Sequence, residues 1–346
     1  SPDASSKRLS RPAAGTDQAP RIAALRADRY AAVGAMFALA LRIANALRKF
    51  LGVPTRMQGG AIGALTLWAT ARTVTAFLTM LLAGCATAPP APLSVDALAD
   101  AISRRPVVLL GEVHDNATQH AVRAEALRRL LASGARPALA FEQFDRERQQ
   151  DLDDARIEAL SPGTGRVDHL IARAGASGWS WNFYRPYLQL AIDYGLPIVA
   201  ANLSRSNAMR IAQQGFGAVF DVHQQADQLL EQLPSWFVAE HQRAVDIGHC
   251  KLIPGSMLPS LAHAQIARDL TLAQAIRPYT GRGVVLLSGN GHVRNDIGVP
   301  YFLTAAERAR TVTIGLLESD DIDAGTIAMH FDVFMLTPAQ PRADPC

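Results

Sequence analysis

Apolar and polar residues follow one another along this chain in the pattern of an α/β domain. Residues 107–110 are wholly apolar and partly β-branched, which is typical of a strand buried on both faces. Residues 117–133 then place apolar side chains at helical spacing, and 137–141 form a second apolar run. Two buried strands joined through a helix predict a βαβ unit, whose strands are parallel and whose crossover is right-handed.

Further apolar runs extend this pattern toward the carboxyl end of the chain. We predict strands at 196–202, 283–288 and 311–317 and an alternating edge strand at 330–336. Helical patterns dominate residues 145–275, apart from a looser connection at 163–179, and this block is too long for a short crossover. The sequence therefore predicts an α/β fold with a mostly parallel sheet flanked by helices. It forms a single domain at 94–340, with an inserted helical subdomain at about 145–275.

Residues 1–93 differ in composition from the rest of the chain. Residues 1–56 join a Ser/Pro/Ala-rich start to an Arg-flanked apolar stretch, and we interpret them as a disordered or spurious N-terminal extension. Residues 57–84 contain Arg72, an apolar run and small residues at their end, which is typical of a signal peptide. A membrane-spanning anchor is the alternative, because this run could cross a bilayer with Arg72 buried at a cost.

The predicted signal peptide ends in the sequence Leu-Ala-Gly-Cys, which is similar to the bacterial lipobox. In that motif the cysteine becomes the lipidated first residue of the mature protein, so Cys85 is the predicted lipidation site. Residues 85–93 form a Pro/Ala-rich tether, and Ala86 resembles the second residue of lipoproteins sorted to the outer membrane. We therefore expect an outer-membrane lipoprotein of the bacterial cell envelope that faces the periplasm and is held there by its lipid anchor.

Composition narrows the class of protein further. The 346 residues are 49% hydrophobic, which is too apolar for disorder and enough for one large domain. A net charge of +3, with no basic run in the globular part, favours no nucleic-acid partner. Only Lys251 follows Lys49, so an anion site in the globular part must rely mostly on arginine. Cys250 and Cys346 could pair in an oxidising compartment, and the sequence leaves this open.

Polar side chains directly follow four of the predicted strands. They are Glu112 and His114 after the first strand, Glu142 after the second, Asn202 after the third, and Asn290 and His292 after the fourth. Because the carboxyl ends of parallel strands meet at one edge of a sheet, we expect these side chains to form one composite site. Glu112, His114 and His292 could hold a divalent metal ion. Together with Glu142 they could instead serve acid–base catalysis in a hydrolase, or form only a buried hydrogen-bond network.

Several segments, taken in order, resemble the ChaN-like haem-binding lipoprotein family. They include LLGEVHDN, FEQF, YRPYLQLAIDYGLPIVAANLSR and VVLLSGNGHVRNDIGVP, and the resemblance covers about residues 94–318. It implies an α/β core with a helical subdomain, and haem held between two protomers of a periplasm-facing lipoprotein that serves iron acquisition. An outer-membrane haem receptor is a further partner for such a role. Gly111-Glu112-Val113-His114 is more distantly similar to erythromycin esterases and GxxH-type metal-dependent peptidases, which implies the hydrolase alternative.

A haem site requires a flat apolar slot, an axial ligand for the iron and cations for the propionates. The candidate iron ligands are Tyr184 and Tyr187 in one helical segment, with Tyr194, Met209 and Met257 as alternatives. The candidate propionate partners are Arg185, Lys251 and Arg294. His249 belongs to a His-Cys pair that the resemblance places near the site. Hydrophobic core is the alternative role of the tyrosines, and a membrane-anchored binding module with only a structural network is the third reading of the chain.

Overall fold

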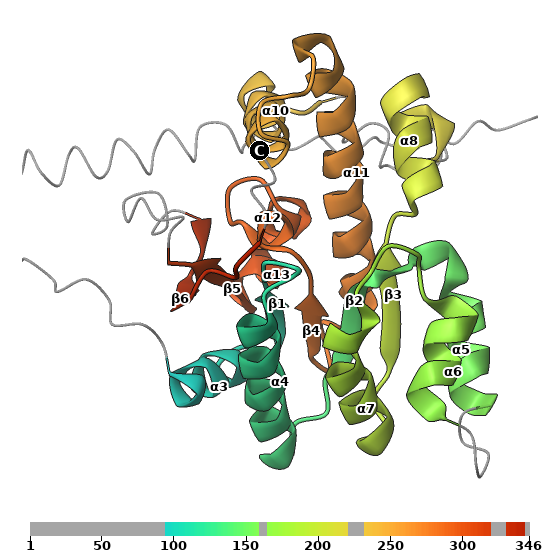
Figure 1. The fold of residues 1–346 in the computed structure, drawn as a ribbon, viewed down its shortest axis with the longest axis vertical. Coiled ribbons are helices and arrows are strands. Elements are labelled where there is room, and N and C mark those ends of the chain that lie inside the picture. The colour runs from blue at the N-terminus through green and yellow to red at the C-terminus, as the bar shows by residue number, and fades with distance from the viewer. Residues whose placement is uncertain (1–93, 159–164, 221–231, 320–329, 343–346) are drawn as a thin grey trace, which may run out of the picture. The chain divides into compact units, whose positions relative to one another are not determined.

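The structure is a computed structural model that describes residues 94–158, 165–220, 232–319 and 330–342 (Figure 1). The predicted N-terminal extension, signal peptide, tether and Cys85 lie outside these residues, and so does Cys346. Among the described residues, no helix is both long and apolar enough to cross a membrane. The residues that follow Ala88 form one compact unit, and this unit carries every feature discussed below.

Six strands among the described residues form one sheet. They are β1 (Val107–Leu110), β2 (Ala138–Asp145), β3 (Ile198–Asn202), β4 (Val284–Leu287), β5 (Thr311–Glu318) and β6 (Val333–Thr337). Their order is β3-β2-β4-β1-β5-β6, and each neighbouring pair is parallel. The predicted α/β fold with a mostly parallel sheet is therefore confirmed, and the strand predicted at 330–336 does lie at an edge.

Helices cover both faces of this sheet. The first face carries α3 (Val95–Ser103), α4 (Ala117–Ala132), α5 (Gln149–Glu158), α6 (Arg166–Ala174) and α7 (Arg185–Asp193). The second face carries α8 (Arg205–Gln214), α10 (Ser235–Gly248) and α11 (Leu258–Ile276), and α12 (Asn290–Val293) and α13 (Ala305–Ala309) connect β4 to β5. Short 3-10 turns are η1 (Arg146–Arg148), η2 (Trp181–Phe183), η3 (Phe216–Ala218), η4 (Gly255–Met257), η5 (Arg277–Tyr279) and η6 (Val299–Phe302).

Residues 145–275, for which we predicted a helical subdomain, supply β3 and helices on both faces of the sheet. Figure 1 shows α10 and the N-terminal part of α11 extending beyond the carboxyl ends of the strands. The loose connection predicted at 163–179 is wrong, because α6 lies within it. Val167, Leu170 and Ala174 of α6 recur at helical spacing and are buried, but the glycines that flank them hide this short pattern in the sequence.

Asn116 joins β1 to α4 at the edge where the strands end. Its side-chain oxygen accepts a hydrogen bond from the backbone N–H of Gln119 at 3.0 Å, so it is the N-cap that its residue type favours. Its amide group donates to Glu318 at 2.7 Å and to the carbonyl of Pro338 at 3.0 Å. Asn116 is fully buried, and it therefore ties the start of α4 to the end of β5.

The connections after neighbouring strands leave toward opposite faces of the sheet. Those after β1 and β2 lead to the helices of the first face, and those after β3 and β4 lead to the second face. Because β4 lies between β1 and β2, the connections diverge on both sides of its carboxyl end. Open parallel sheets bind ligands at such topological switch points. The fold thus selects the ends of β1, β4 and β2 as the candidate site.

Candidate functional site

The residues that follow these three neighbouring strands lie close together around Gly289, just after β4. The backbone N–H of Gly289 donates to Oε2 of Glu142, which lies on β2, at 2.8 Å. A methyl group at Gly289 would lie 2.8 Å from Nε2 of His114, which follows β1, and 3.8 Å from Oε2 of Glu142. The structure therefore brings together side chains that the sequence places more than a hundred residues apart, and we name this group the strand-end site.

Glu112 is fixed from several sides although it has almost no contact with solvent. Its carboxylate forms an ion pair with Arg123 of α4, whose side chain is fully buried. It also accepts hydrogen bonds from the hydroxyl of Tyr184 at 2.6 Å and from Nδ1 of His114 at 2.9 Å. Arg123 supplies the opposite charge that a buried carboxylate requires. Because it is buried, Glu112 can affect a ligand only indirectly, through the side chains that contact it.

His114 is the accessible member of this network. Its side chain is 45% exposed, whereas that of Glu112 is 0% exposed. Because Nδ1 donates to Glu112, Nε2 carries the lone pair in the neutral imidazole. Partial burial lowers the pKa of His114, Glu142 opposes this shift and the nearby His292 adds to it. The ring also meets the indole of Trp179 edge-on at 4.9 Å, so its orientation is set by both a carboxylate and an aromatic wall.

The second histidine of the strand-end site, His292, lies between two carboxylates. Its Nδ1 donates to Oδ1 of Asp269, on α11, at 2.7 Å, and its Nε2 lies 3.4 Å from Oε1 of Glu142. Burial disfavours the charged ring, but Glu142 and Asp269 outweigh it and raise the pKa of His292 to about 10. Burial likewise opposes ionisation of Glu142, yet His292 lowers the pKa of that carboxyl to about 2. His292 is therefore a fixed imidazolium at neutral pH.

A divalent metal site has no support among the described residues, where no group of three or more His, Cys, Asp or Glu could hold a metal ion. The predicted ligands Glu112, His114 and His292 come near one another, but Glu112 and His292 are already engaged with other groups. Glu112 is paired with Arg123, and both ring nitrogens of His292 face carboxylates. A metal ligand must offer a free lone pair, so two of these three residues are unsuited to the role.

The two tyrosines predicted to bind haem lie in the core of the first face. Tyr184 is 1% exposed and Tyr187 is fully buried. Their hydroxyls donate to Glu112 at 2.6 Å and to the carbonyl of His120 at 2.9 Å, respectively. Burial raises the pKa of both hydroxyls, which disfavours the phenolate that would bind ferric iron. Their positions thus give them a structural role beside Glu112 and offer no access to a haem.

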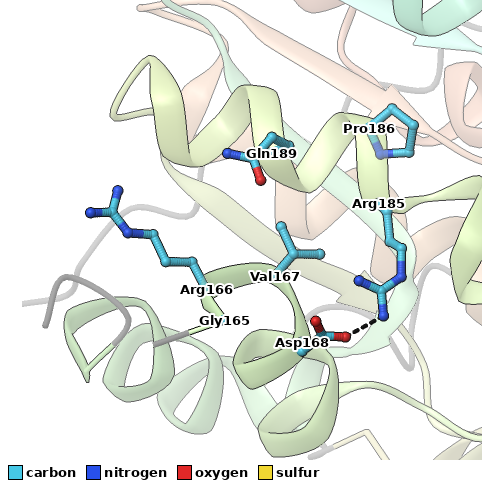
Figure 2. Close-up of a pocket in the computed structure, with 7 residues that line it drawn as sticks. All are labelled: Gly165, Arg166, Val167, Asp168, Arg185, Pro186 and Gln189. Carbon is cyan, nitrogen blue, oxygen red and sulfur yellow. Dashed lines mark hydrogen bonds and ion pairs between the residues drawn. The ribbon is translucent and has the colours of Figure 1, made fainter. Parts of the chain in front are cut away.

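The three predicted propionate partners differ in how their charge is used. Arg185 pairs with Asp168 at a surface pocket of about 380 Å³ between α6 and α7 (Figure 2). Arg294 pairs with Asp296 and Glu240. Lys251, in contrast, is exposed and has no ion pair among the residues that the structure describes. Lys251 is therefore the cation of the three that can meet an anionic ligand without breaking an existing pair.

Lys251 belongs to a second exposed feature, the helical tip, which we define as residues 247–257 at the end of α10 and in the connection to α11. Three large hydrophobic side chains are exposed on it, Ile247 at 53%, Leu252 at 74% and Met257 at 51%. His249 is also exposed, and its Nδ1 donates to the carbonyl of Val245 at 2.7 Å. This bond leaves Nε2 as the nitrogen with a lone pair. The helical tip thus combines apolar surface, an oriented imidazole and a cation.

Some residues of both features have no obvious signal in the sequence. Arg123 stands on the apolar stripe of α4, one helical turn after His120 and one before Leu127, and all three are buried. A charged residue on an apolar stripe could have suggested a buried partner. Ile247 and Leu252 carry no such signal, because exposure of an aliphatic side chain depends on how the connection between two helices turns.

The parallel sheet, with polar side chains gathered at a topological switch point, defines a doubly wound α/β protein with a candidate site at its strand ends. The family model described as haem-binding uptake, Tiki superfamily, ChaN matches residues 98–303, more than half of the chain. The chain belongs to this haem-binding uptake family. A comparison with curated protein sequences found no match.

One solved structure supports the fold. The chain is similar to ChaN of Campylobacter jejuni, whose structure is described as showing cofacial haem binding, with a TM-score of 0.57 and 20% sequence identity over 70% of this chain and 91% of that one. It is less similar to an erythromycin esterase variant in its open conformation, with a TM-score of 0.38 and 13% identity over 66% and 74% of the two chains. The type III effector HopBA1 gives a TM-score of 0.36 and 13% sequence identity over 71% of this chain and 94% of that one. The last two TM-scores are below 0.5 and decide nothing about activity.

Proposed function

We propose that the protein binds haem at the helical tip and serves haem or iron acquisition as a lipoprotein of the bacterial envelope. Membership of the haem-binding uptake family supports the ligand. The observation that carries the location is the exposure of Ile247, Leu252 and Met257 on one short segment beside His249 and Lys251. Exposed apolar surface of this kind, edged by polar groups, marks binding sites.

The residues of the helical tip fit the chemistry of haem. An imidazole whose Nδ1 donates to a backbone carbonyl has a fixed ring and a more basic Nε2, which suits His249 as an axial ligand. Met257 is the softer ligand on the same segment. The aliphatic side chains can cover porphyrin carbons, and Lys251 can pair with a propionate. When bound, the haem would supply an iron that His249 or Met257 would hold.

The proposal includes a homodimer around the ligand. Haem is flat, and a single projecting segment can cover only one of its faces. A second copy of the helical tip would cover the other face and remove more apolar surface from water. Anchoring through lipidated Cys85, an orientation toward the periplasm and delivery by an outer-membrane haem receptor belong to the same proposal.

A hemin titration tests the location directly. We expect a saturable Soret change with the wild-type protein, weakened at least tenfold in His249→Ala and several-fold in Met257→Ala. Ile157→Ala is the matched control, because Ile157 is a large hydrophobic side chain that is 68% exposed and lies on α5, away from the helical tip. Equal affinity in all four proteins would contradict this location. Light scattering should show a dimer with hemin, and a monomer at saturation would contradict the dimer.

A further inference from the structure

We propose that the edge of the sheet where the strands begin is a docking surface for a membrane that contains anionic phospholipids. The proposal goes beyond haem binding and rests on one part of the proposed function, the lipid anchor at Cys85. The surface is marked by four exposed arginines, which we name the arginine row: Arg105, Arg136, Arg282 and Arg310. They lie at the amino ends of the strands, opposite to the strand-end site.

Each arginine of the row comes just before a different strand. Arg310 is the last residue before β5, and the other three each stand two residues before β1, β2 or β4. These strands are neighbours in the order β2-β4-β1-β5, and their first residues are paired in register. Because neighbouring strands lie about 4.8 Å apart, the backbone of the row extends over about 14 Å. The sheet thus gathers cations that lie far apart in the sequence.

Hydrogen bonds hold the segments that carry the row. The backbone N–H of Val107 donates to the carbonyl of Arg310 at 3.2 Å. The guanidinium of Arg282 donates to the carbonyl of Arg136 at 3.1 Å, and the guanidinium of Arg136 lies 4.9 Å from the centre of the Tyr194 ring. The spacing of the row is therefore set by the sheet and its immediate connections.

The positive charge of the row is not used within the part of the chain that the structure describes. There, none of its four arginines forms an ion pair. The acidic residues of the adjoining segments are engaged elsewhere, since Asp100 pairs with Arg104 and Glu307 pairs with Arg277. A row of like charges creates a positive potential over the surface. Guanidinium groups spread over about 14 Å match an extended array of phosphates, to which arginine can donate two parallel hydrogen bonds.

The chain before the row indicates a membrane as the anionic partner. Helix α3 has 9 residues and ends directly before Arg104 and Arg105, so its N-cap Ser94 lies within about 14 Å of its other end. The tether predicted at residues 85–93 can span at most about 30 Å. A membrane that held a lipidated Cys85 would therefore be within reach of the arginine row. Near an anionic lipid surface, each arginine strengthens binding by about fivefold.

Docking of this kind gives the helical tip a defined orientation. Figure 1 shows α10 and the start of α11 beyond the carboxyl ends of the strands, whereas the arginine row lies at their amino ends. A protein that rests on the membrane through the row therefore presents the helical tip on the side away from the lipid. The proposed haem site then stays open to hemin and to a second copy.

The test measures binding of the full chain to vesicles of phosphatidylcholine, and of equal parts phosphatidylcholine and phosphatidylglycerol. Cys85→Ser is present in every sample, so that no lipid anchor contributes. The test variant adds Arg105→Gln, Arg282→Gln and Arg310→Gln. On phosphatidylglycerol vesicles, its lipid concentration at half binding should exceed that of Cys85→Ser alone by about tenfold or more, and this difference should shrink at high salt. On phosphatidylcholine the two proteins should bind equally.

The matched control removes the same charge from the other end of the sheet. It combines Arg205→Gln, Arg210→Gln and Arg243→Gln, because these arginines are exposed on α8, which follows the carboxyl end of β3, and on α10. The control should bind phosphatidylglycerol vesicles like Cys85→Ser alone. Equal half-binding concentrations in the test variant and Cys85→Ser alone would overturn the proposal, and so would an equal loss in the control.

Hydrogen exchange locates the contact independently of the segment before Ser94. Backbone amides of residues 280–283 should exchange more slowly on phosphatidylglycerol vesicles than in buffer, and an unchanged rate there would also overturn the proposal. Labelled palmitate tests the anchor separately, since it should enter the wild type and not Cys85→Ser. An unlabelled wild type would refute the anchor and leave charge-dependent vesicle binding standing. Hemin affinity should be the same in the test variant and Cys85→Ser alone, so the haem site and the docking surface can fail separately.

Discussion

Arg123 and Glu112 form an ion pair in which neither side chain has any exposed surface. Arg123 comes from α4 and Glu112 from the end of β1, and the guanidinium also donates to the carbonyl of Leu110 at 2.8 Å. A buried ion pair adds little stability relative to an apolar pair, because both charges must be desolvated. Removal of one partner is different, since the other charge is then left buried and uncompensated.

We therefore expect Arg123→Leu to lower the free energy of unfolding by about 3 to 5 kcal/mol. Arg129→Leu on the same helix is the control, because Arg129 pairs with Asp96 and Glu125 at the surface and such pairs contribute at most about 1 kcal/mol. Urea unfolding followed by circular dichroism measures both variants. If the two substitutions have equal effects, the Arg123–Glu112 pair is not buried as described.

Gly111, between β1 and Glu112, should not tolerate a side chain. A methyl group there would lie 2.8 Å from Cγ2 of Val293 and 3.1 Å from the carbonyl of Ile314, and would collide with the side chain of Asn290. Asn290 cannot move away easily, because it exchanges hydrogen bonds with the backbone of Leu316 on β5. Gly111→Ala should therefore destabilise the protein by about 1 to 3 kcal/mol in urea unfolding, as overpacking usually does.

Gly291→Ala is the matched control for this prediction. Gly291 lies at the same strand ends, but a methyl group there would meet nothing within 4 Å. The substitution should change the free energy of unfolding by less than about 1 kcal/mol. A loss in Gly291→Ala as large as in Gly111→Ala would show that the strand ends are sensitive to any substitution, rather than crowded at Gly111.

The charge of His292 should make stability fall in alkaline solution. Its pKa is raised to about 10 in the folded protein, against an ordinary value of 6.5 that applies to the unfolded chain. The stabilisation is therefore complete below the ordinary value and is lost as pH rises toward about 10, by a few kcal/mol in total. Urea unfolding at several pH values from about 7 to about 10 measures this slope.

His292→Gln removes the titrating ring. The difference between this variant and the wild type therefore gives the part of the pH dependence of stability that is due to His292. The variant will be less stable at neutral pH, because Glu142 and Asp269 lose their cation. Its free energy of unfolding should nevertheless change less with pH over the alkaline range than that of the wild type. Parallel curves for the two proteins would mean that His292 is neutral in the fold and that the two carboxylates do not hold a proton on it.

Much of the sheet could be predicted because its evidence is local. Residues 107–110 are apolar on both faces, and this pattern is typical of strands in a covered parallel sheet. Polar residues directly after such runs must gather at one edge, so Glu112, His114, Glu142 and His292 could be grouped without a structure. The order β3-β2-β4-β1-β5-β6 could not be derived, because a run of the same composition fits any interior position.

The functions of single side chains were harder to predict than their grouping. Tyr184 and Tyr187 were expected to meet a ligand, but exposure depends on how this segment packs on the sheet, and both are buried, Tyr184 directly before α7 and Tyr187 within it. Arg185 and Arg294 were expected to bind anions, yet Arg185 pairs with Asp168 of α6, and Arg294 pairs with Glu240 of α10 besides the nearby Asp296. Long-range pairing of this kind is decided by tertiary packing, which the spacing of residues does not encode.

The last prediction concerns the charge at the helical tip. Lys251 adopts a φ of 58°, in the left-handed region where asparagine is favoured, so Lys251→Asn removes the charge without straining the backbone. If Lys251 pairs with a haem propionate, this variant should bind hemin about three- to tenfold more weakly at low salt, and the difference should shrink at high salt as the pair is screened. Arg105→Asn is the control, since Arg105 is exposed and lies before the amino end of β1, whereas the strand-end site follows the carboxyl end of that strand. Equal salt-dependent losses in both variants would indicate a non-specific attraction of hemin to positive charge, and no loss in Lys251→Asn would separate Lys251 from the ligand.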